Sequence, residues 1–287
     1  MVTVSNIAYK QYGNCVQLSN GAFRLLITTD LGPRIIFYGE TNGENIFYED
    51  AQDLIRKDGD YFDRNLPGKG AWHIYGGHRL WKSPEDLASY YPDNAPVRTE
   101  FVPNGVTVTS EPESTTGLQK SMTVTMADDG SVCVQHAFYN FTDRASEPVA
   151  LWGLSVLDKG ACATYPLSTR DTGLLANRNL VLWSYTDVRD DRLRIEQDKI
   201  TLRWDDVAQP IKIGMYIEDP IRVHTKGLEL TVTYDYAGEN AGYADRCCNV
   251  ESYTNDIMLE VETLSTLESI APGQYKYHTE RWSLRKL

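Results

Sequence analysis

The sequence has few cysteines, and they follow no recognisable pattern. There are five, an odd number, and the only adjacent pair is Cys247 and Cys248. A disulfide framework needs paired cysteines and a structural zinc site needs closely spaced ligand pairs, so the sequence predicts neither. We interpret the adjacent pair as reduced thiols near the start of a strand.

Long apolar runs and basic stretches are also absent. No segment approaches the roughly 20 apolar residues that cross a membrane, and the first residues lack the features of a secretory signal peptide. Lys and Arg number 28 against 40 Asp and Glu, a formal net charge of -12, and the positive charge is too dispersed for a phosphate backbone. We therefore expect a cytoplasmic protein that binds no membrane and no nucleic acid, and whose acidic surface favours neutral ligands.

The sequence also lacks the glycine-rich strings of nucleotide-binding folds and any alternation of strand and helix patterns, which argues against Rossmann, P-loop and α/β-barrel enzymes. What it has instead is period-two alternation. Met122, Val124 and Met126 share one face of a segment that residues 128–130 turn back into residues 131–141. This pattern predicts a β-hairpin.

Similar alternation recurs along the whole chain, with Gly, Pro, Asn and Asp between many of the runs. It predicts further strands at residues 16–18, 22–28, 34–38, 99–101, 106–109, 149–156, 180–185, 200–204, 211–217, 228–235, 257–264 and 275–284. Helical patterns are limited to residues 50–57 and to a segment that opens with Ser83 and Pro84 and ends at Tyr90. We predict a single all-β domain over residues 1–287, a large antiparallel double sandwich or β-supersandwich with one or two short helices.

The segment from residue 59 to residue 97 breaks this rhythm and is predicted to be a long loop, where binding chemistry tends to lie. A sugar needs flat aromatic faces for its C–H surface and charged or bidentate partners for its hydroxyls. The aromatic faces are supplied by Trp72, Tyr75, Trp81 and Tyr91, and the partners for the hydroxyls by His78, Arg79, Glu85 and Asp93. The alternative is that the loop packs over one end of the sandwich and its charges pair with one another.

A metal site is a further alternative for His73, His78 and Glu85. Their separations match no familiar ligand pattern, so we predict no bound metal. The other histidines lie in or beside predicted strands and are expected to belong to the framework: His136, His224 and His278.

Two carboxylates share one face of the strand predicted at residues 257–264. Alternation places Glu260 and Glu262 together, and Leu259 and Val261 on the opposite face. If the acidic face meets solvent, the carboxylates are only solvated. If it lines a cleft, their repulsion raises a pKa toward that of a general base, which suits the removal of a proton from a sugar hydroxyl.

Two other residues have two interpretations each. Arg34, at a turn that enters a strand, either forms an interstrand ion pair or contacts a ligand. Trp152, within a strand, belongs either to the core or to the site.

Several of these stretches together resemble the galactose mutarotase-like superfamily, which contains the aldose 1-epimerases. The stretches follow one another along nearly the whole chain: Gly32-Pro33-Arg34, the run from Tyr75 to Glu85, the strand with Glu260 and Glu262, Ala271-Pro272-Gly273, and the run from His278 to Leu284. The resemblance implies a β-supersandwich whose concave face holds a sugar, and no cofactor. In family members that act as mutarotases, a His protonates the ring oxygen while a Glu takes the anomeric proton, and the ring opens, rotates and recloses.

The resemblance also assigns residues. The family's His-Gly-Gly region falls on residues 73–78, so His78 or His73 contacts the sugar, and its Leu-Glu-Pro-Gln strand falls on the stretch around Glu260, which becomes the base. The chain departs where mutarotases carry a second histidine, because residues 151–155 read Leu-Trp-Gly-Leu-Ser and offer no titratable group. The usual general acid is therefore missing at that point.

We predict an aldose epimerase-like enzyme with Glu260 as the base and His78 as the acid or a hydroxyl ligand. Its other predicted sugar contacts are Arg34, Arg79, Trp81 as a stacking platform, Glu85, Asp93, Trp152 and Glu262. The partner is a small sugar or an oligosaccharide, and the protein is a monomer or a homodimer. The alternatives are a non-catalytic carbohydrate-binding module, and a glycoside hydrolase or lyase in which Glu85 or Asp93 supplies a second carboxyl roughly 5–10 Å from Glu260.

Overall fold

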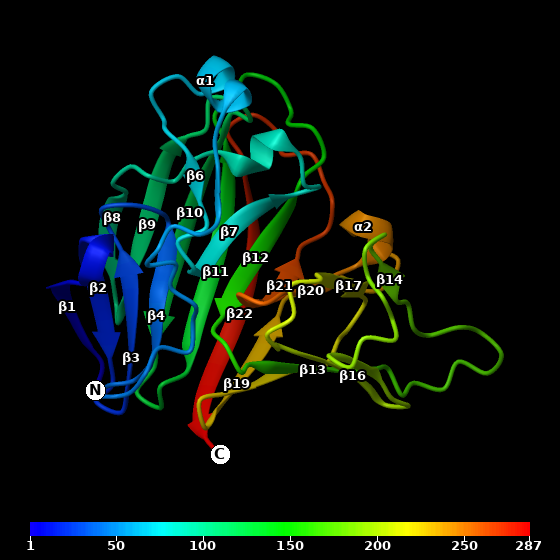
Figure 1. Cartoon of the computed structure of the whole chain (residues 1–287). Coiled ribbons are helices and arrows are strands. Elements are labelled where there is room, and N and C mark those ends of the chain that lie inside the picture. Colours follow the sequence, from blue (N-terminus) through cyan, green and yellow to red (C-terminus); the bar gives the residue numbers. More distant parts are fainter.

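The protein consists of two stacked antiparallel β-sheets with very little helix (Figure 1). The computed structural model describes all 287 residues. Each of the two main sheets has ten strands. This confirms the predicted all-β supersandwich with short helices.

The first sheet contains, from edge to edge, β1 (Thr3–Ala8), β2 (Asn14–Ser19), β3 (Phe23–Thr28), β4 (Arg34–Glu40), β7 (Gly77–Ser83), β12 (Ala150–Leu157), β21 (Leu259–Leu264), β20 (Val250–Thr254), β17 (Ile211–Met215) and β14 (Val181–Leu182). The second sheet contains β15 (Leu193–Ile195), β16 (Lys199–Arg203), β13 (Cys162–Pro166), β18 (Ile221–Thr225), β19 (Leu228–Tyr234), β22 (Tyr275–Lys286), β11 (Val132–Asn140), β10 (Leu118–Met126), β9 (Gly105–Pro112) and β8 (Arg98–Val102). The remaining elements are a two-stranded sheet of β5 (Arg56–Lys57) and β6 (Trp72–His73), the helices α1 (Asp60–Asn65) and α2 (Ala244–Cys247), and the 3-10 turns η1 (Lys10–Tyr12) and η2 (Leu87–Tyr90).

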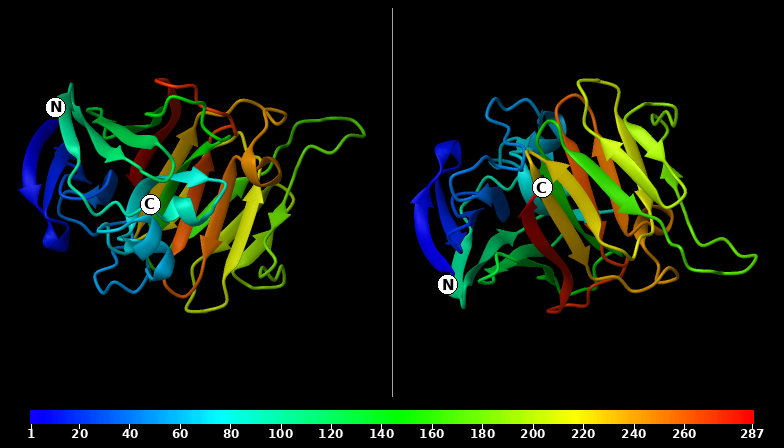
Figure 2. Two further views of the ribbon diagram at one scale, coloured as in Figure 1. Left: turned by 90° about the horizontal axis from the view of Figure 1, so that it is seen from above. Right: turned by 90° about the horizontal axis from the view of Figure 1, so that it is seen from below.

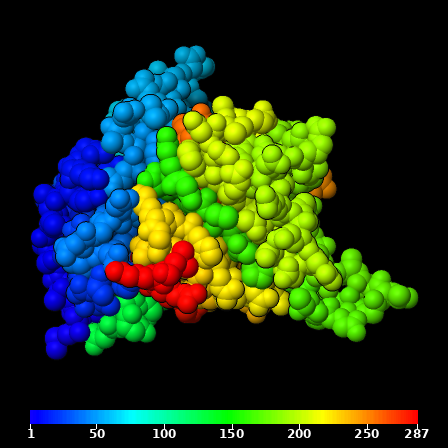
Figure 3. All heavy atoms as spheres, turned by 60° about the horizontal axis from the view of Figure 1, so that its bottom comes forward, coloured from blue at the N-terminus to red at the C-terminus, as the bar shows by residue number.

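The N-terminal strands β1 to β4 lie at one end of the molecule, and strands β13 to β17 lie at the other (Figure 2). Residues 167–180, between β13 and β14, project from the body as an extended loop (Figure 1). Figure 3 shows the same green segment standing clear of the molecule. None of the helices is long and apolar enough to span a membrane.

The core lies between the two sheets, because alternate side chains of each strand point inward. Leu259 and Val261 of β21 belong to it, as do Met122 and Val124 of β10. The hairpin predicted from the β10 pattern is present, with β10 and β11 paired in register. Trp282 of β22 lies buried between the sheets.

One segment predicted to be a loop contains a central strand. Within residues 59–97, β7 pairs with β4 on one side and β12 on the other. Its side chains alternate, with His78 and Leu80 facing inward and Arg79 and Trp81 facing outward. Because each face of β7 mixes polar and apolar residues, the usual apolar alternation does not reveal the strand.

Two glycines allow β7 to begin where it does. Gly76 and Gly77 have φ values of +94° and +71°, in the region that favours glycine. A Cβ atom on Gly76 would lie 2.0 Å from the carbonyl oxygen of Tyr48, and one on Gly77 would lie 2.2 Å from that of Ile35. The backbone can approach its neighbours this closely only without a side chain.

The first helix prediction is wrong, and the second is right only in its end at Tyr90. Residues 50–57 form turns and β5, because the Asp50 carboxylate accepts hydrogen bonds from the amides of Leu54 and Ile55, both at 2.9 Å, and bends the chain. The segment that ends at Tyr90 is the short 3-10 turn η2, and its N-cap is Asp86.

A buried polar network lies inside the sandwich behind β7. His78 Nε2 is 2.7 Å from His136 Nε2, and His78 Nδ1 is 2.8 Å from the hydroxyl of Ser155. His136 donates from Nδ1 to the carbonyl of His278 at 3.2 Å, so its Nε2 accepts the proton of His78. Burial lowers the pKa of His78 well below its ordinary value and those of His136 and His278 to about 3, so the three imidazoles are neutral at pH 7.

Glu280 shares this interior and has no cationic partner. Its carboxyl accepts hydrogen bonds from the hydroxyl of Thr263 at 2.5 Å and from the indole N–H of Trp282 at 2.7 Å. Burial raises the pKa of Glu280 to about 7, although both hydrogen bonds oppose the shift. The carboxyl therefore holds a proton in mildly acid solution, where an unfolded glutamate is ionised.

We expect Glu280→Gln to stabilise the protein relative to wild type as the pH rises from 5 to 8. Glu280 ionises at about pH 4.3 in the unfolded chain and at about pH 7 in the folded protein. The stability that the protonated carboxyl contributes is therefore complete below about pH 4.3 and is lost as the pH rises through 7. Glutamine cannot ionise and does not show this loss, which urea unfolding at pH 5 and pH 8 measures, with exposed Glu239→Gln as the control. An equal difference between variant and wild type at pH 5 and pH 8 contradicts the prediction.

Candidate functional site

Neighbouring strands of the first sheet carry charged residues on the face that points away from the core. Strand register places Arg79, Glu262 and Glu251 in one row across β7, β12, β21 and β20. Glu260 and Lys212 lie in the next row, which extends from β21 to β17. The fold therefore gathers two cations and three carboxylates, from distant parts of the sequence, on one patch.

Lys212 binds two of these carboxylates. Its Nζ lies 2.8 Å from Glu251 Oε2 and 3.1 Å from Glu262 Oε2. The indole N–H of Trp152 donates to the same Glu262 oxygen at 2.9 Å. Burial lowers the pKa of Lys212, but the two carboxylates outweigh it and hold the pKa above its ordinary value. Since Glu251 and Glu262 are fully buried, this cluster is closed to a ligand.

Glu260 is the carboxylate of the patch that keeps an open surface. Its side chain is 11% exposed, against 0% for Glu251 and Glu262. Burial, and then repulsion from Glu262, raise the pKa of Glu260 to about 7, while the charges of Arg79 and Lys212 oppose the shift. A carboxyl with a pKa near neutrality can take and return a proton at physiological pH.

Arg79 connects Glu260 with a cluster of aromatic rings. Its Nη2 lies 3.8 Å from Glu260 Oε1, and its guanidinium carbon lies 4.8 Å from the ring centre of Trp81 and 5.5 Å from that of Trp72. Burial lowers the pKa of Arg79 to about 10, which leaves it charged at pH 7. Its Nε and Nη1 are buried without a hydrogen-bond partner in the protein. Such donors cost free energy until a ligand or water supplies acceptors.

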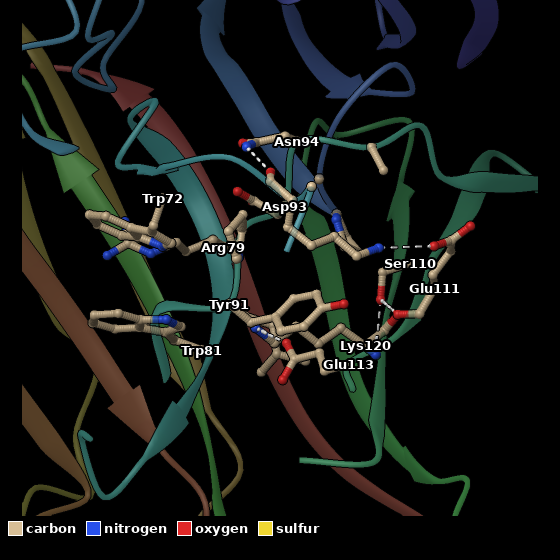
Figure 4. Close-up of a pocket in the computed structure, with 17 residues that line it drawn as sticks. Trp72, Arg79, Trp81, Tyr91, Asp93, Asn94, Ser110, Glu111, Glu113 and Lys120 are labelled. Atoms are coloured by element: carbon tan, nitrogen blue, oxygen red, sulfur yellow. Dashed lines mark hydrogen bonds and ion pairs between the residues drawn. The ribbon is translucent and has the colours of Figure 1, made fainter. Parts of the chain in front are cut away.

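A cavity of about 270 Å³ opens beside Arg79. Figure 4 shows Trp72 and Trp81 stacked on one side of it, Ser110 and Glu111 on the opposite side, and the ion pair of Glu113 and Lys120 near Tyr91. The aromatic, amide and charged residues of its lining include Trp72, Arg79, Trp81, Tyr91, Asp93 and Asn94. This combination of flat rings and hydrogen-bonding groups is typical of a small-molecule site.

Arg34 supports one wall of this cavity from beneath. It is fully buried, donates from Nη1 to the carbonyls of Ile74 at 2.9 Å and Gly76 at 2.6 Å, and binds Asp93 Oδ2 through Nη2 at 2.7 Å. Asp93 Oδ1 is buried and has no partner. Arg79 and Asp93 thus both line the cavity, and each has buried polar atoms without a hydrogen-bond partner in the protein.

The structure brings together four of the predicted site residues. Arg79, Trp81 and Asp93 line the cavity, and Glu260 lies next to Arg79. Glu85 is exposed, accepts a hydrogen bond from the hydroxyl of Tyr90, and contributes to the raised pKa of Glu260.

Four other predicted site residues lie away from any open surface, which corrects their predicted direct contacts with a sugar. His78 has no exposed surface and faces the core, because strand alternation points it opposite to Arg79. Arg34 is buried beneath the cavity, and Trp152 and Glu262 are bound to each other.

His73, the other histidine predicted to contact the sugar, does not line the cavity either. His73 forms a hydrogen bond of 2.5 Å with Asp53, and His224 pairs with Glu229 at 2.9 Å on the second sheet. No histidine forms a hydrogen bond or an ion pair with Glu260. No group of three or more His, Cys, Asp or Glu side chains is arranged to hold a metal ion.

Two charged residues of the patch were missed by sequence reasoning, Lys212 and Glu251. Each is a single charged residue within a short strand that is otherwise apolar or uncharged, β17 and β20. The same signal singles out Glu260 and Glu262 in β21, so applying it to every predicted strand would have found Lys212.

Comparisons with known proteins bear on the fold. No protein-family model matches the sequence, and no curated protein matches it. A TPR-domain containing protein from Parabacteroides distasonis superposes with a TM-score of 0.60 and 17% identity, over 94% of this chain and 47% of that one. This chain thus spans about half the length of that protein.

Two further solved structures match over whole chains. A galactose mutarotase-like protein from Clostridium acetobutylicum has a TM-score of 0.55 and 11% identity, covering 100% of this chain and 99% of the other. A protein from Escherichia coli K12 assigned to the aldose 1-epimerases has a TM-score of 0.54 and 9% identity, covering 100% of both chains. The fold that the resemblance implied is therefore confirmed. At sequence identities this low, structural similarity shows the fold alone.

Proposed function

We propose that this is a carbohydrate-active protein of the aldose-epimerase kind, in which a neutral sugar binds beside Arg79 and Trp81 and Glu260 transfers a proton. One observation carries the proposal: a stacked tryptophan pair lines one cavity together with Arg79 and Asp93, which both have polar atoms without a hydrogen-bond partner. A sugar ring offers an apolar face and hydroxyls that both donate and accept, so it suits such a lining. The shared fold with galactose mutarotase-like proteins supports the same class.

Glu260 does not line the cavity itself but lies next to Arg79, which does, and the proposed chemistry starts from its carboxylate. The ionised carboxylate takes the proton of the anomeric hydroxyl, the bond between C1 and the ring oxygen breaks, and the ring oxygen gains a proton from solvent. After rotation about the C1–C2 bond, these steps run in reverse and Glu260 returns its proton to the anomeric oxygen. Arg79, whose Nη2 is 3.8 Å from Glu260, supplies positive charge beside the oxygen on which negative charge develops.

The missing histidine limits the expected rate. A positioned acid contributes about 10²- to 10⁴-fold, so we expect a weaker acceleration than from a complete acid–base pair. The same observation favours a second candidate function, a non-catalytic carbohydrate-binding module that uses the same cavity.

Proton NMR of freshly dissolved aldoses tests the proposal. We expect at least one unprotected pentose or hexose to reach its α/β equilibrium faster with the protein than without it. Calorimetric titration with the same sugars separates the two candidates, since a module binds without accelerating the exchange. Neither binding nor acceleration for any aldose would contradict both.

We take residues 1–287 as one domain that works in the cytoplasm, without a cofactor, as a monomer or a homodimer. Its partner is a small sugar or an oligosaccharide.

A further inference from the structure

The second sheet has an open face of its own, which points away from the core. Strands β8, β9, β10, β11 and β22 are neighbours there, and their outward side chains line a shallow cavity of about 240 Å³. This cavity shares no lining residue with the one beside Arg79. Five strands about 4.8 Å apart span about 19 Å, so the face is longer than a single sugar ring.

Three tyrosines form a strip along one side of this face. The rings of Tyr275 and Tyr277 are nearly parallel, with an interplanar angle of 14° and centres 5.7 Å apart. The ring of Tyr139 lies 4.6 Å from that of Tyr275. Tyr275 and Tyr277 are each 53% exposed, and none of the three hydroxyls forms a hydrogen bond within the protein. Rings with an apolar body and a free polar tip suit ligands that are apolar on one face and polar at the rim.

The rest of the face carries uncharged hydroxyl and amide groups. They are arranged in register across the strands and include Thr107, Thr109, Gln119, Ser121, Thr123 and Gln135. The two charged residues that line the cavity, Arg98 and Glu100, have opposite signs and form no ion pair. A cavity lining without net charge, on a chain with a formal net charge of -12, favours a neutral ligand rich in hydroxyls.

The lining of this cavity also has little aliphatic surface. Apart from Ala137, the cavity on this face is lined by no aliphatic residue, and its aromatic residues are confined to the tyrosine strip.

We infer that the outer face of the second sheet, between β8 and β22, binds a neutral polysaccharide chain, with Tyr275 and Tyr277 stacking on its rings. The inference is independent of the proposed function, because it rests on a different face and requires no proton transfer. It gives the protein a second carbohydrate surface, suited to holding a polymer rather than a free sugar.

Affinity electrophoresis of the whole chain in native gels tests this inference. The gels contain one soluble neutral polysaccharide each: xylan, galactan, glucomannan, mixed-linkage glucan or starch. We expect at least one to retard the protein, and the double variant Tyr275→Ala, Tyr277→Ala to weaken that binding about tenfold or more. Tyr277→Phe keeps the ring and is expected to keep most of the binding.

Tyr236→Ala is the matched control, because Tyr236 is 49% exposed and lines a different cavity. Glu260→Gln should be retarded like wild type, so failure of this inference and failure of the proposed catalysis are distinguishable. No retardation in any gel, or equal retardation of the double variant and wild type, overturns the inference. So does size-exclusion chromatography that shows a wild-type dimer and a monomeric double variant, since the face would then join two copies of the chain.

Discussion

Glu260→Gln is expected to slow aldose interconversion by about 10²- to 10⁴-fold, which is the contribution of a positioned proton-transfer group. Glutamine keeps the size of the side chain but cannot take a proton from the anomeric hydroxyl. Sugar binding should change far less, because Arg79, Trp81 and Asp93 remain in place. Proton NMR exchange rates and calorimetric titration measure the two effects separately.

The wild-type rate should also depend on pH in one direction. Burial and the charge of Glu262 raise the pKa of Glu260 to about 7, and only the ionised form acts as a base. The protein-dependent rate should therefore fall below pH 7 and level off above it, once spontaneous exchange is subtracted. Exposed Glu239→Gln is the control and should match wild type. An unchanged rate in Glu260→Gln would remove Glu260 from the chemistry, and binding without any rate effect in wild type would favour the binding module.

Lys212→Met is expected to lower the free energy of unfolding by about 3–5 kcal/mol. Methionine fills a similar volume but leaves Glu251 and Glu262 buried beside each other without their cation, and an uncompensated buried charge is strongly destabilising. Burial raises the pKa of Glu251 to about 8 even beside Lys212, so its charge is present at pH 8 and largely absent at pH 5, and the loss should be larger at pH 8. Urea unfolding at the two pH values measures both effects.

Two variants serve as controls for this loss. Lys286→Met breaks the exposed pair with Glu40 and should cost about 0–1 kcal/mol. Adding Glu251→Gln to Lys212→Met removes the carboxyl whose pKa burial raises to about 8, and it should recover part of the stability at pH 8. A loss below about 1 kcal/mol in Lys212→Met alone would mean that water or a rearranged side chain replaces the cation.

Local patterns predicted most of the strands but not the helices. The hairpin of β10 and β11 follows from alternation at Met122, Val124 and Met126, because one face of each strand is uniformly apolar. Alternation did not predict the strand β7, since Arg79 and His78 place polar groups on both of its faces. The turn around Asp50 resembled a helix because short polar segments form either structure, and two side-chain hydrogen bonds decide between them.

The candidate site was predicted in part for a similar reason. Residue type and spacing identified Arg79, Trp81, Asp93 and Glu260 as suited to sugar chemistry. They did not show that His78 points into the core. Residue type shows which chemistry a side chain can perform, whereas strand register and alternation decide on which side of the sheet that side chain lies.

The amino-acid sequence alone thus determined the all-β class, the residue types able to handle a sugar, and the acidic character of the chain, because composition and period-two patterning are local properties. Tertiary structure decided the rest. It brought Lys212 to Glu262 and Arg79 to Glu260, buried three histidines between the sheets, and left the tyrosine strip of β22 exposed. These outcomes depend on which distant strands pair and how deeply each side chain is buried, and both are set only when the two sheets close on a common core.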